Sequence, residues 1–346
     1  MFGISVYLKD MDQEYIRKAA SYNAKYIFTS LHIPEEDLSN ATNQIKELLS
    51  YCEKYQLHLV PDVSPVTFEK LNLAQGDFTK LSELGVQSIR LDYGFNDFNY
   101  IKDLQENFEI MLNASIINEE FILKCEAHGI DLGKITAVHN FYPKHDTGLA
   151  KSYYQKLNKV LVKYKIKILT FVIGDKLKRF PLYEGLPTIE AHRTVHPYVA
   201  AVELVRELDS TGVMIGDSMA SDFALKAIDD FLVNKIITLP VYLESGAVDF
   251  YHQSLRCRRD LSDQIVRVTT PRTSGIKATN NGSRQKGNII LLNELAGRYC
   301  GELQLCKADL SFSVEGNTIG FVAPEFLPLL NYLDFEYELR FVPIGG

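Results

Sequence analysis

The chain has 346 residues, of which 46% are hydrophobic and 23% charged, and its formal net charge is −7. This composition excludes wholesale disorder, a collagen-like repeat and a small disulfide-built protein, and the length suggests roughly two domains. A nucleic-acid-binding protein needs a basic surface, and the one basic cluster, Arg256–Arg259, is short. We therefore predict a globular protein without a nucleic-acid partner.

The cysteines and the N-terminal segment indicate in which cellular compartment the protein is expected. The five cysteines are odd in number and show no C-x-x-C spacing, which argues against a zinc knuckle or a redox dithiol. The first apolar stretch ends at Lys9, too soon for a signal peptide, and no run approaches the roughly 18 apolar residues of a membrane helix. We predict a cytoplasmic protein with no membrane partner and no cofactor, and we leave its oligomeric state open.

Short apolar runs alternate with longer helical patterns over the first two thirds of the chain. The predicted strands are Gly3–Leu8, Tyr26–Ser30, Leu57–Pro61, Val86–Leu91, Glu109–Leu112, Ile135–Val138, Lys167–Ile173 and Val213–Ile215. The predicted helices are Gln13–Tyr22, Asp37–Tyr55, Phe78–Glu83, Asp97–Leu104, Asn118–His128, Leu149–Tyr164, Pro197–Leu208 and Ala220–Phe231. Eight such pairs in roughly 235 residues are typical of an α/β protein built as a (β/α)8 TIM barrel. A doubly wound open sheet is the alternative, although no glycine-rich nucleotide-binding motif is present.

The pattern changes near Asn234–Tyr242, after which short strand-like pieces are separated by turns. These pieces are Gln264–Thr270, Asn288–Leu292, Glu302–Cys306, Leu310–Val314, Thr318–Val322 and Phe335–Val342. The glycines and asparagines of Pro271–Gly287 predict a loop. We therefore predict a barrel domain over residues 1–235 and a small, mostly β domain over residues 240–346.

Polar side chains follow nearly every predicted barrel strand. The active sites of such barrels lie at the C-terminal ends of the strands. The candidates at those ends are Tyr7, Ser30, His32, Asp62, Arg90, Asp92, Tyr93, Asn113, His139, Asn140, Tyr142, Glu190, His192, Arg193 and Asp217. Because so many polar groups share one end of the barrel, the sequence predicts a functional site there.

The carboxylates among these candidates each allow a structural interpretation as well. Arg90 and Asp92 are two residues apart on a predicted strand, so both side chains are expected to face the barrel mouth. They form either a catalytic carboxylate with its arginine, an arginine that grips a substrate anion beside an acid, or a structural ion pair. Asp217 either faces the mouth or caps the helix that follows it.

Metal, Schiff-base and serine chemistry find little support in the sequence. His192 and His196 have the i, i+4 spacing of zinc-binding helices, but no third ligand is evident, so we predict no metal. Lys144 lies in a loop beyond Pro143, where a Schiff-base lysine is not expected, and no G-x-S-x-G is present. We expect His192 and Arg193 to present positive charge to an anionic substrate instead.

Carboxylates, cations and the aromatic residues Tyr7, Tyr93, Phe141 and Tyr142 together fit a glycosidase that acts on an anionic sugar. Two alternatives stay open at this point. One is a barrel aldolase or epimerase that acts on a phosphorylated sugar. The other is a sugar-phosphate-binding protein without catalysis.

Several runs of the chain resemble one known family. They are GISVY at Gly3–Tyr7, FTSLHIPE at Phe28–Glu35, RLDYG at Arg90–Gly94, HNFYP with TGL within His139–Leu149, EGLPTIEAHR at Glu184–Arg193, IGDS at Ile215–Ser218 and RYCGELQL at Arg298–Leu305. They resemble the MupG family, the 6-phospho-N-acetylmuramidases of Gram-positive peptidoglycan recycling. The resemblance implies a TIM barrel followed by a cyclophilin-like domain. It also implies hydrolysis of the phosphorylated disaccharide N-acetylmuramic acid 6-phosphate–N-acetylglucosamine into its two sugars.

With this substrate, Asp92, Glu190 and Asp217 become the candidate catalytic carboxylates. We expect Asp92 near the anomeric carbon and Glu190 or Asp217 as the acid/base, while attack by the 2-acetamido group of the substrate stays an alternative. The barrel residues expected to bind the substrate are Tyr7, Ser30, His32, Arg90, Tyr93, His139, Asn140, Tyr142, His192 and Arg193. Arg256 and Arg272 of the second domain are further substrate-binding candidates for the case in which that domain closes over the mouth.

Overall fold

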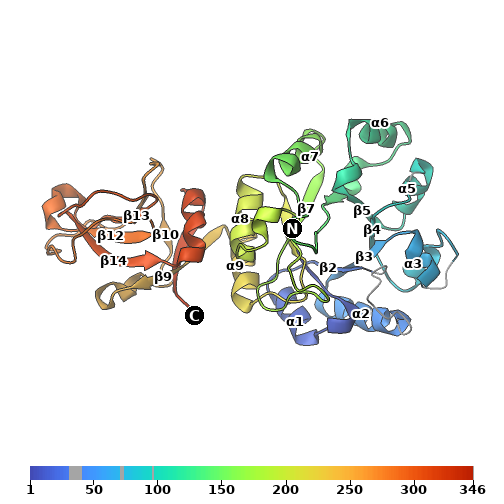
Figure 1. Ribbon diagram of the computed structural model, residues 1–346, viewed down its shortest axis with the longest axis horizontal. Coiled ribbons are helices and arrows are strands. Elements are labelled where there is room, and N and C mark those ends of the chain that lie inside the picture. The colour runs from blue at the N-terminus through green and yellow to red at the C-terminus, as the bar shows by residue number, and fades with distance from the viewer. Residues whose placement is uncertain (31–40, 71–73, 96, 346) are drawn as a thin grey trace. The chain divides into compact units, whose positions relative to one another are not determined.

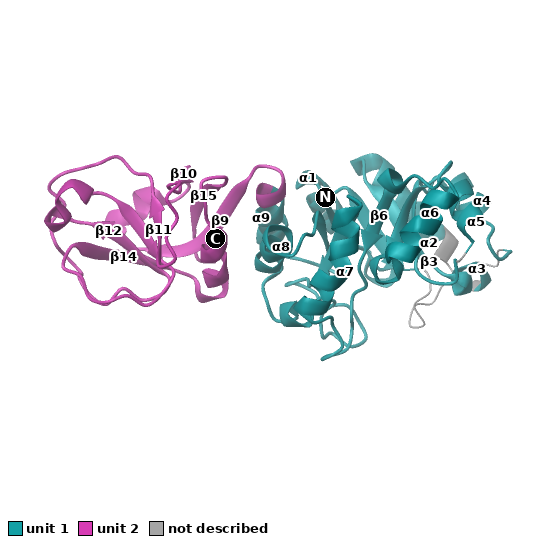
Figure 2. Cartoon of the chain, turned by 90° about the horizontal axis from the view of Figure 1, so that it is seen from above, with its two compact units in different colours: residues 1–229 teal, residues 230–346 magenta. Residues whose placement is uncertain are grey.

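The computed structural model describes residues 1–30, 41–70, 74–95 and 97–345. Its internal contacts divide the chain into two compact units, residues 1–229 and residues 230–346, which Figure 2 shows in separate colours. Unit 1 and unit 2 each have their own sheet and their own apolar core.

Unit 1 is a closed barrel of parallel strands that follow one another in chain order (Figure 1). The strands are β1 (Phe2–Ser5), β2 (Tyr26–Ser30), β3 (His58–Val63), β4 (Ser88–Leu91), β5 (Glu109–Asn113), β6 (Ile135–Val138), β7 (Lys167–Val172) and β8 (Gly212–Ile215). The barrel closes where β1 pairs with β8, with Ile4 opposite Ile215. The predicted (β/α)8 barrel is therefore confirmed, and the open-sheet alternative is wrong.

Amphipathic helices connect the barrel strands and pack on the outside of the barrel. They are α1 (Gln13–Ser21), α2 (Ala41–Tyr55), α3 (Pro65–Lys70), α4 (Thr79–Glu83), α5 (Phe98–Leu104), α6 (Glu119–Ala127), α7 (Lys151–Lys163), α8 (Pro197–Arg206) and α9 (Asp222–Leu232). In α2, Ile45, Leu48 and Cys52 are buried on one face, as the helical spacing predicts. Among the described helices, α3 was not predicted from the sequence.

The barrel interior is an apolar layer that carries polar residues directly above it. The layer consists of Phe28, Val60, Met111, Val138, Leu169, Phe171 and Met214, all buried and packed together. Side chains alternate along a strand, so a residue two positions further on faces the same way and lies nearer the C-terminal end. Two positions beyond members of the layer stand Ser30, Asp62, Asn113 and Asn140. The mouth therefore continues the interior face of the barrel with polar groups.

Unit 2 is built on one mixed seven-stranded sheet with the order β10-β15-β9-β14-β12-β13-β11. Its strands are β9 (Ile236–Leu243), β10 (Leu255–Arg256), β11 (Ile265–Val268), β12 (Asn288–Leu292), β13 (Leu303–Cys306), β14 (Gly316–Val322) and β15 (Glu338–Pro343). Neighbouring strands are antiparallel except for β9 and β15, which run parallel. The mostly β second domain is confirmed, whereas its likeness to cyclophilin stays a prediction.

Unit 2 differs from the sequence-based expectation at β9, at the unpredicted short strand β10 and at Leu310–Val314. The interior strand β9 was not predicted, although its Ile, Leu and Val side chains are all buried. The predicted strand Leu310–Val314 is wrong, because only Leu310 forms a bridge there, to Arg284. In the part of the chain that the structure describes, no helix combines the length and the apolar character needed to cross a bilayer.

Candidate active site

A buried arginine at the end of β4 connects polar side chains from four neighbouring strands. Arg90 Nη1 lies 2.5 Å from Asp62 Oδ1 and 3.1 Å from Asp92 Oδ1, and Nη2 donates to Asn140 Oδ1. Asn113 Nδ2 donates to the same Asp92 oxygen at 3.2 Å. The Arg90 and Asp62 side chains are 3% and 7% exposed, whereas the Asp92 side chain is 18% exposed. Asp92 is therefore the carboxylate of this network that solvent, and hence a substrate, reaches.

Two members of the Arg90 network, Asp62 and Asn113, are among the candidates at the strand ends. They are not among the residues that the sequence predicts to be catalytic or substrate-binding. Each stands two positions beyond a side chain of the interior layer, Val60 or Met111. That spacing was the available signal, because it places a polar group on the inner face at the mouth. Ser30, which was predicted, is buried and lies in register with Asp62 on the neighbouring strand.

The predicted residue Tyr7 lies just after β1, the strand that pairs with β8 to close the barrel. Its ring is buried, and its hydroxyl donates to the carbonyl of Gly216 at 2.6 Å. Tyr7 packs with Phe180 and Leu186 from the loop that follows β7. The central guanidinium carbon of Arg179, from the same loop, lies 4.6 Å from the Tyr7 ring centroid. Sequence reasoning missed Arg179, which lies between two aromatic residues only in the folded chain.

Asp217 anchors the loop after β7 from its position at the end of β8. Its Oδ1 accepts the N–H of Arg179 at 2.9 Å, and its Oδ2 accepts the N–H groups of Gly174 at 2.9 Å and Leu186 at 3.2 Å. Lys178 Nζ lies 3.7 Å from Oδ2, and the Asp217 side chain is fully buried. This geometry favours a role in holding the loop over a role in proton transfer.

Glu190 and Arg193 form a clamp between the loops that follow β6 and β7. Arg193 Nε and Nη2 each lie 2.6 Å from a Glu190 oxygen, and the guanidinium also donates to the carbonyls of Gly185 and Lys144 at 3.0 Å. The hydrogen bonds from Arg193 lower the pKa of Glu190 to about 2. Glu190 is therefore ionised at neutral pH, which disfavours it as a proton donor, and the charge of Arg193 is already paired.

Two of the three predicted histidines, His139 and His192, face helices. His139 Nε2 lies 2.8 Å from Asn158 Oδ1 on α7, and burial lowers the pKa of His139 to about 4, which keeps it neutral. His192 is buried, with Nε2 2.9 Å from Glu203 Oε2 on α8. These contacts favour internal roles for both rings. Within the described ranges, no three His, Cys, Asp or Glu side chains gather as a metal site would require.

The remaining barrel candidates lie on loops at the mouth. Tyr93 is 52% exposed. Tyr142 is half-buried, burial raises the pKa of its phenol, and its backbone N–H donates to the Pro187 carbonyl. The Lys144 side chain is 63% exposed and pairs with Glu184, an environment unlike that of a desolvated Schiff-base lysine. His32 lies outside the described residues.

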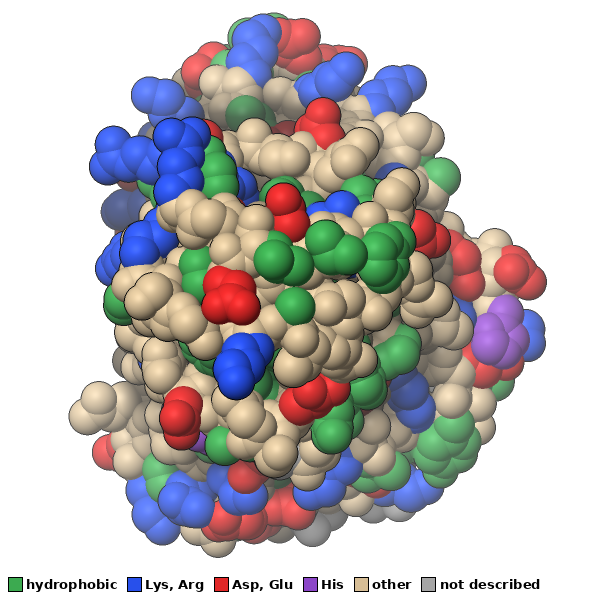
Figure 3. All heavy atoms as spheres, turned by 90° about the vertical axis from the view of Figure 1, so that its left-hand side faces the viewer, with side chains coloured by type: hydrophobic (Ala, Val, Ile, Leu, Met, Phe, Trp, Pro, Cys, Tyr) green, Lys and Arg blue, Asp and Glu red, His purple; other side chains and the backbone are tan. Residues whose placement is uncertain are grey.

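Arg256 and Arg272 belong to unit 2, where they line a pocket of about 530 Å³. The buried carboxylate of Glu302 holds part of this pocket together: it accepts two hydrogen bonds from Arg267, at 2.9 and 2.8 Å, and one from Arg272 at 3.3 Å. On the face that Figure 3 shows, Lys and Arg side chains lie along the upper left and along the bottom of the view, with Asp and Glu side chains among them. A role of these arginines at the barrel mouth stays a prediction.

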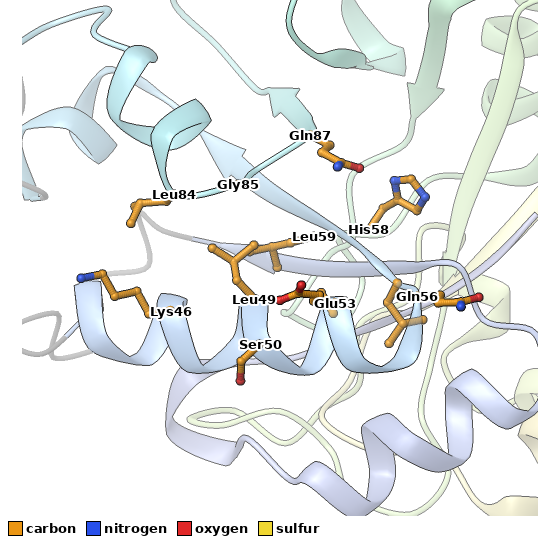
Figure 4. A pocket seen from close by; sticks show the side chains of 12 residues that line it. Lys46, Leu49, Ser50, Glu53, Gln56, His58, Leu59, Leu84, Gly85 and Gln87 are labelled. Carbon is orange, nitrogen blue, oxygen red and sulfur yellow. The ribbon is translucent and has the colours of Figure 1, made fainter.

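A larger pocket, of about 640 Å³, opens beside α2 in unit 1 (Figure 4). Its lining includes His58, the first residue of β3, and Gln87, which directly precedes β4. These positions mark the N-terminal ends of the strands, the end that serves stability in barrels of this type. The candidate active site therefore remains the opposite, C-terminal end.

Two solved structures are similar to this chain over nearly its whole length. A conserved protein of unknown function from Enterococcus faecalis is 27% identical with a TM-score of 0.87, and the match covers 100% of this chain and 97% of that one. An uncharacterised B. cereus protein is 24% identical with a TM-score of 0.78, and the match covers 99% of both chains, which shows a shared fold. Among curated proteins, no match is found.

Two family models, which describe the two parts of one kind of enzyme, match consecutive parts of the chain. The model for the N-terminal part of 6-phospho-N-acetylmuramidase, MupG_N, matches residues 2–230. The model for the C-terminal part, MupG_C, matches residues 237–342. Together they span both the barrel with its polar mouth and the β unit. The chain belongs to the 6-phospho-N-acetylmuramidase family and is a glycosidase.

Proposed function

We propose that this chain hydrolyses N-acetylmuramic acid 6-phosphate–N-acetylglucosamine into its two sugars, with Asp92 as the carboxylate that acts at the anomeric carbon. The family supports a glycosidase and a phosphorylated amino-sugar substrate. One observation carries the choice of residue: Asp92 is a partly exposed carboxylate at the barrel mouth that Arg90 and Asn113 hold in place.

Glycoside hydrolysis passes through an oxocarbenium-like transition state, which a fixed carboxylate stabilises. Asp62 holds Arg90 at 2.5 Å, and Arg90 and Asn113 in turn hold one oxygen of Asp92. The other oxygen is then oriented toward the reacting carbon without a loss of side-chain freedom during the reaction. In this scheme Asp92 acts either as the nucleophile or as the group that orients the 2-acetamido group of the substrate.

The other predicted carboxylates have positioning roles in this proposal. Glu190 and Arg193 clamp the loops after β6 and β7, and Asp217 holds the loop after β7 against the end of β8. Asn140 belongs to the Arg90 network and Ser30 borders it. Tyr93 and Tyr142 offer ring faces for the sugars. We place the reaction in the cytoplasm, as a step in the recycling of peptidoglycan fragments.

The test compares Asp92→Asn with wild type on the phosphorylated disaccharide and on its unphosphorylated twin, with products followed by mass spectrometry. We expect wild type to cleave only the phosphorylated form. We expect Asp92→Asn to lower kcat by roughly 10³-fold or more, because the amide keeps the shape but loses the charge. The melting temperature should stay close to that of wild type.

Asp97→Asn is the matched control for this test. Asp97 caps α5 by accepting the N–H groups of Asn99 and Tyr100, and asparagine is an equally good cap. Its kcat should equal that of wild type. A folded Asp92→Asn variant with activity within tenfold of wild type would rule out the catalytic role, and a folded wild type that cleaves neither disaccharide would rule out the substrate.

A further inference from the structure

The loop after β7 carries a buried arginine without a counterion in the part of the chain that the structure describes. Arg179 is only 7% exposed, and its Nε and Nη2 are buried with no hydrogen-bond partner among the described residues. Buried cations are normally paired, because an unpaired charge away from water is costly. The described fold therefore leaves two buried N–H groups of Arg179 without hydrogen-bond acceptors.

The guanidinium of Arg179 lies over the faces of two aromatic rings. Its central carbon lies 4.6 Å from the ring centroid of Tyr7 and 5.4 Å from that of Phe180. A ring face attracts a cation but does not accept the in-plane N–H bonds of the guanidinium. The edge formed by Nε and Nη2 thus calls for an acceptor in its own plane.

Two other arginines of the chain show what this edge binds. Arg193 places Nε and Nη2 on the two oxygens of Glu190, each at 2.6 Å. Arg267 places the same two atoms on Glu302, at 2.9 and 2.8 Å. In both, two parallel N–H bonds match the two oxygens of a carboxylate, a geometry that phosphate also fits. The edge of Arg179 has the same donors and lacks the oxyanion.

The backbone holds Arg179 at the C-terminal end of the barrel. Its own N–H donates to Asp217 at 2.9 Å, after β8, and its stacking partner Tyr7 follows β1. Further positive charge lies nearby: Lys178 is the preceding residue, and Lys9 Nζ lies 4.5 Å from the centroid of the Phe180 ring. Both oxygens of Asp217 already accept backbone N–H groups, so this carboxylate does not serve the guanidinium edge.

We propose that Arg179 binds an oxyanion of the substrate through its Nε–Nη2 edge and so determines specificity for an anionic sugar. This assignment rests on the proposed function, whose substrate carries two such groups, a 6-phosphate and a lactyl carboxylate. The two N–H donors of the Nε–Nη2 edge can bind either the phosphate or the carboxylate. Because solvent does not reach the two nitrogens, binding includes a movement of the side chains that cover them.

Three monosaccharides separate the two sources of the oxyanion. N-acetylmuramic acid 6-phosphate carries both groups, N-acetylglucosamine 6-phosphate carries only the phosphate, and N-acetylmuramic acid carries only the carboxylate. Their affinities for the full chain are measured by titration calorimetry for wild type, Arg179→Met and Arg179→Lys. Lys176→Met is the matched control, since it removes a positive charge from an exposed position of the same loop.

We expect Arg179→Met to bind N-acetylmuramic acid 6-phosphate roughly 10- to 100-fold more weakly than wild type. Of the two sugars that carry only one anionic group, one should bind more weakly by the same factor and the other should bind as tightly as to wild type. The sugar that loses affinity identifies the group that Arg179 contacts. Arg179→Lys should recover part of the loss, because it restores the charge without the fork. Lys176→Met should bind all three sugars as wild type does.

Wild-type affinity of Arg179→Met for all three sugars would overturn the proposal, and so would an equal loss for all three. If Arg179→Met does not fold, the same pattern is sought in Arg179→Lys, which keeps the charge and the stem. The binding experiment needs no turnover. A wild type that fails to hydrolyse the disaccharide but shows the Arg179-dependent pattern would therefore count against the proposed reaction and leave the oxyanion site standing.

Discussion

Arg193 and Arg179 both follow β7 in the chain, and each is almost fully buried. Arg193 is neutralised by Glu190 three residues away, a spacing that the sequence itself displays. Arg179 has no such neighbour, and its environment comes from Tyr7 and Asp217, far away in the chain. Arg193 is thus paired inside the protein, whereas Arg179 has no carboxylate partner among the described residues.

The Glu190–Arg193 pair predicts a specific dependence of stability on pH. The pKa of Glu190 is lowered from 4.5 to about 2, so its contribution is complete above about pH 4.5 and is lost as the pH falls toward 2. We expect Glu190→Gln to be less stable than wild type toward urea at neutral pH. The difference in free energy of unfolding should shrink below about pH 4.5.

Glu126→Gln, at an exposed position of α6, is the control for this series and should show no such difference. A deficit of Glu190→Gln that stays constant from about pH 7 to about pH 3 would contradict the lowered pKa of Glu190. It would assign the deficit to packing instead.

The sequence predicted the side-chain types at the mouth better than it predicted their partners. Alternation along β4 placed Arg90 and Asp92 together, and the structure shows them in contact. His139 and His192 were expected at the mouth because they lie in the segments that follow β6 and β7, yet their rings face α7 and α8. Whether a residue just beyond a strand turns inward or outward depends on the loop, which a single sequence does not reveal.

At the scale of elements, the loop after β7 depends on one side chain of the next strand end. Asp217 accepts three backbone N–H groups from this loop, at Gly174, Arg179 and Leu186. Asparagine offers one acceptor oxygen and points an amide at the remaining N–H groups. We expect Asp217→Asn to lower the free energy of unfolding by about 3 kcal/mol or more. Its kcat should fall as well, because Arg179 is displaced.

Thermal unfolding and kinetics on the same preparation test this prediction for Asp217. Asp222→Asn, at an exposed position on α9, serves as control and should behave as wild type in both. An Asp217→Asn variant that loses activity at an unchanged melting temperature would show instead that the carboxylate takes part in the reaction itself.

Strand β9 shows why the strands of unit 2 were harder to predict than those of the barrel. This strand contains Pro240, which has no N–H for the sheet and which argues against a central strand in a sequence. The structure nevertheless places β9 between β14 and β15. Conversely, Leu310–Val314 alternates like a strand but is largely exposed, so no sheet covers it.

At the scale of the whole molecule, all five cysteines are free and buried. Burial raises the pKa of Cys52 and Cys257 to about 12 and that of Cys125 and Cys306 to about 11. The reactive thiolate is therefore scarce near neutral pH. We expect the folded chain to react negligibly with a thiol reagent and the unfolded chain to react at five positions.

When the labelled cysteines are identified by mass spectrometry at increasing urea concentrations, the same reaction reports on the unfolding of each unit separately. Cys52 and Cys125 report on unit 1, and Cys257, Cys300 and Cys306 report on unit 2. Rapid labelling of any cysteine in the folded chain would contradict the burial described above. Recovery of fewer than five reactive thiols after unfolding without reductant would indicate a disulfide.

The barrel was predictable because each of its strands is followed by its own helix, so local patterns repeat in chain order. The closure between β1 and β8 and the order of the unit 2 sheet join distant segments, and no local pattern announces them.

The position of β9 also governs when unit 2 can form as the chain leaves the ribosome. β9 emerges directly after the barrel, but its parallel neighbour β15 follows only after β10 to β14. The nascent chain therefore carries an apolar strand with an open edge until β15 has also been synthesised. Premature termination just before β15 would leave that edge permanently bare, so a truncated product would be prone to aggregate even though its barrel is complete.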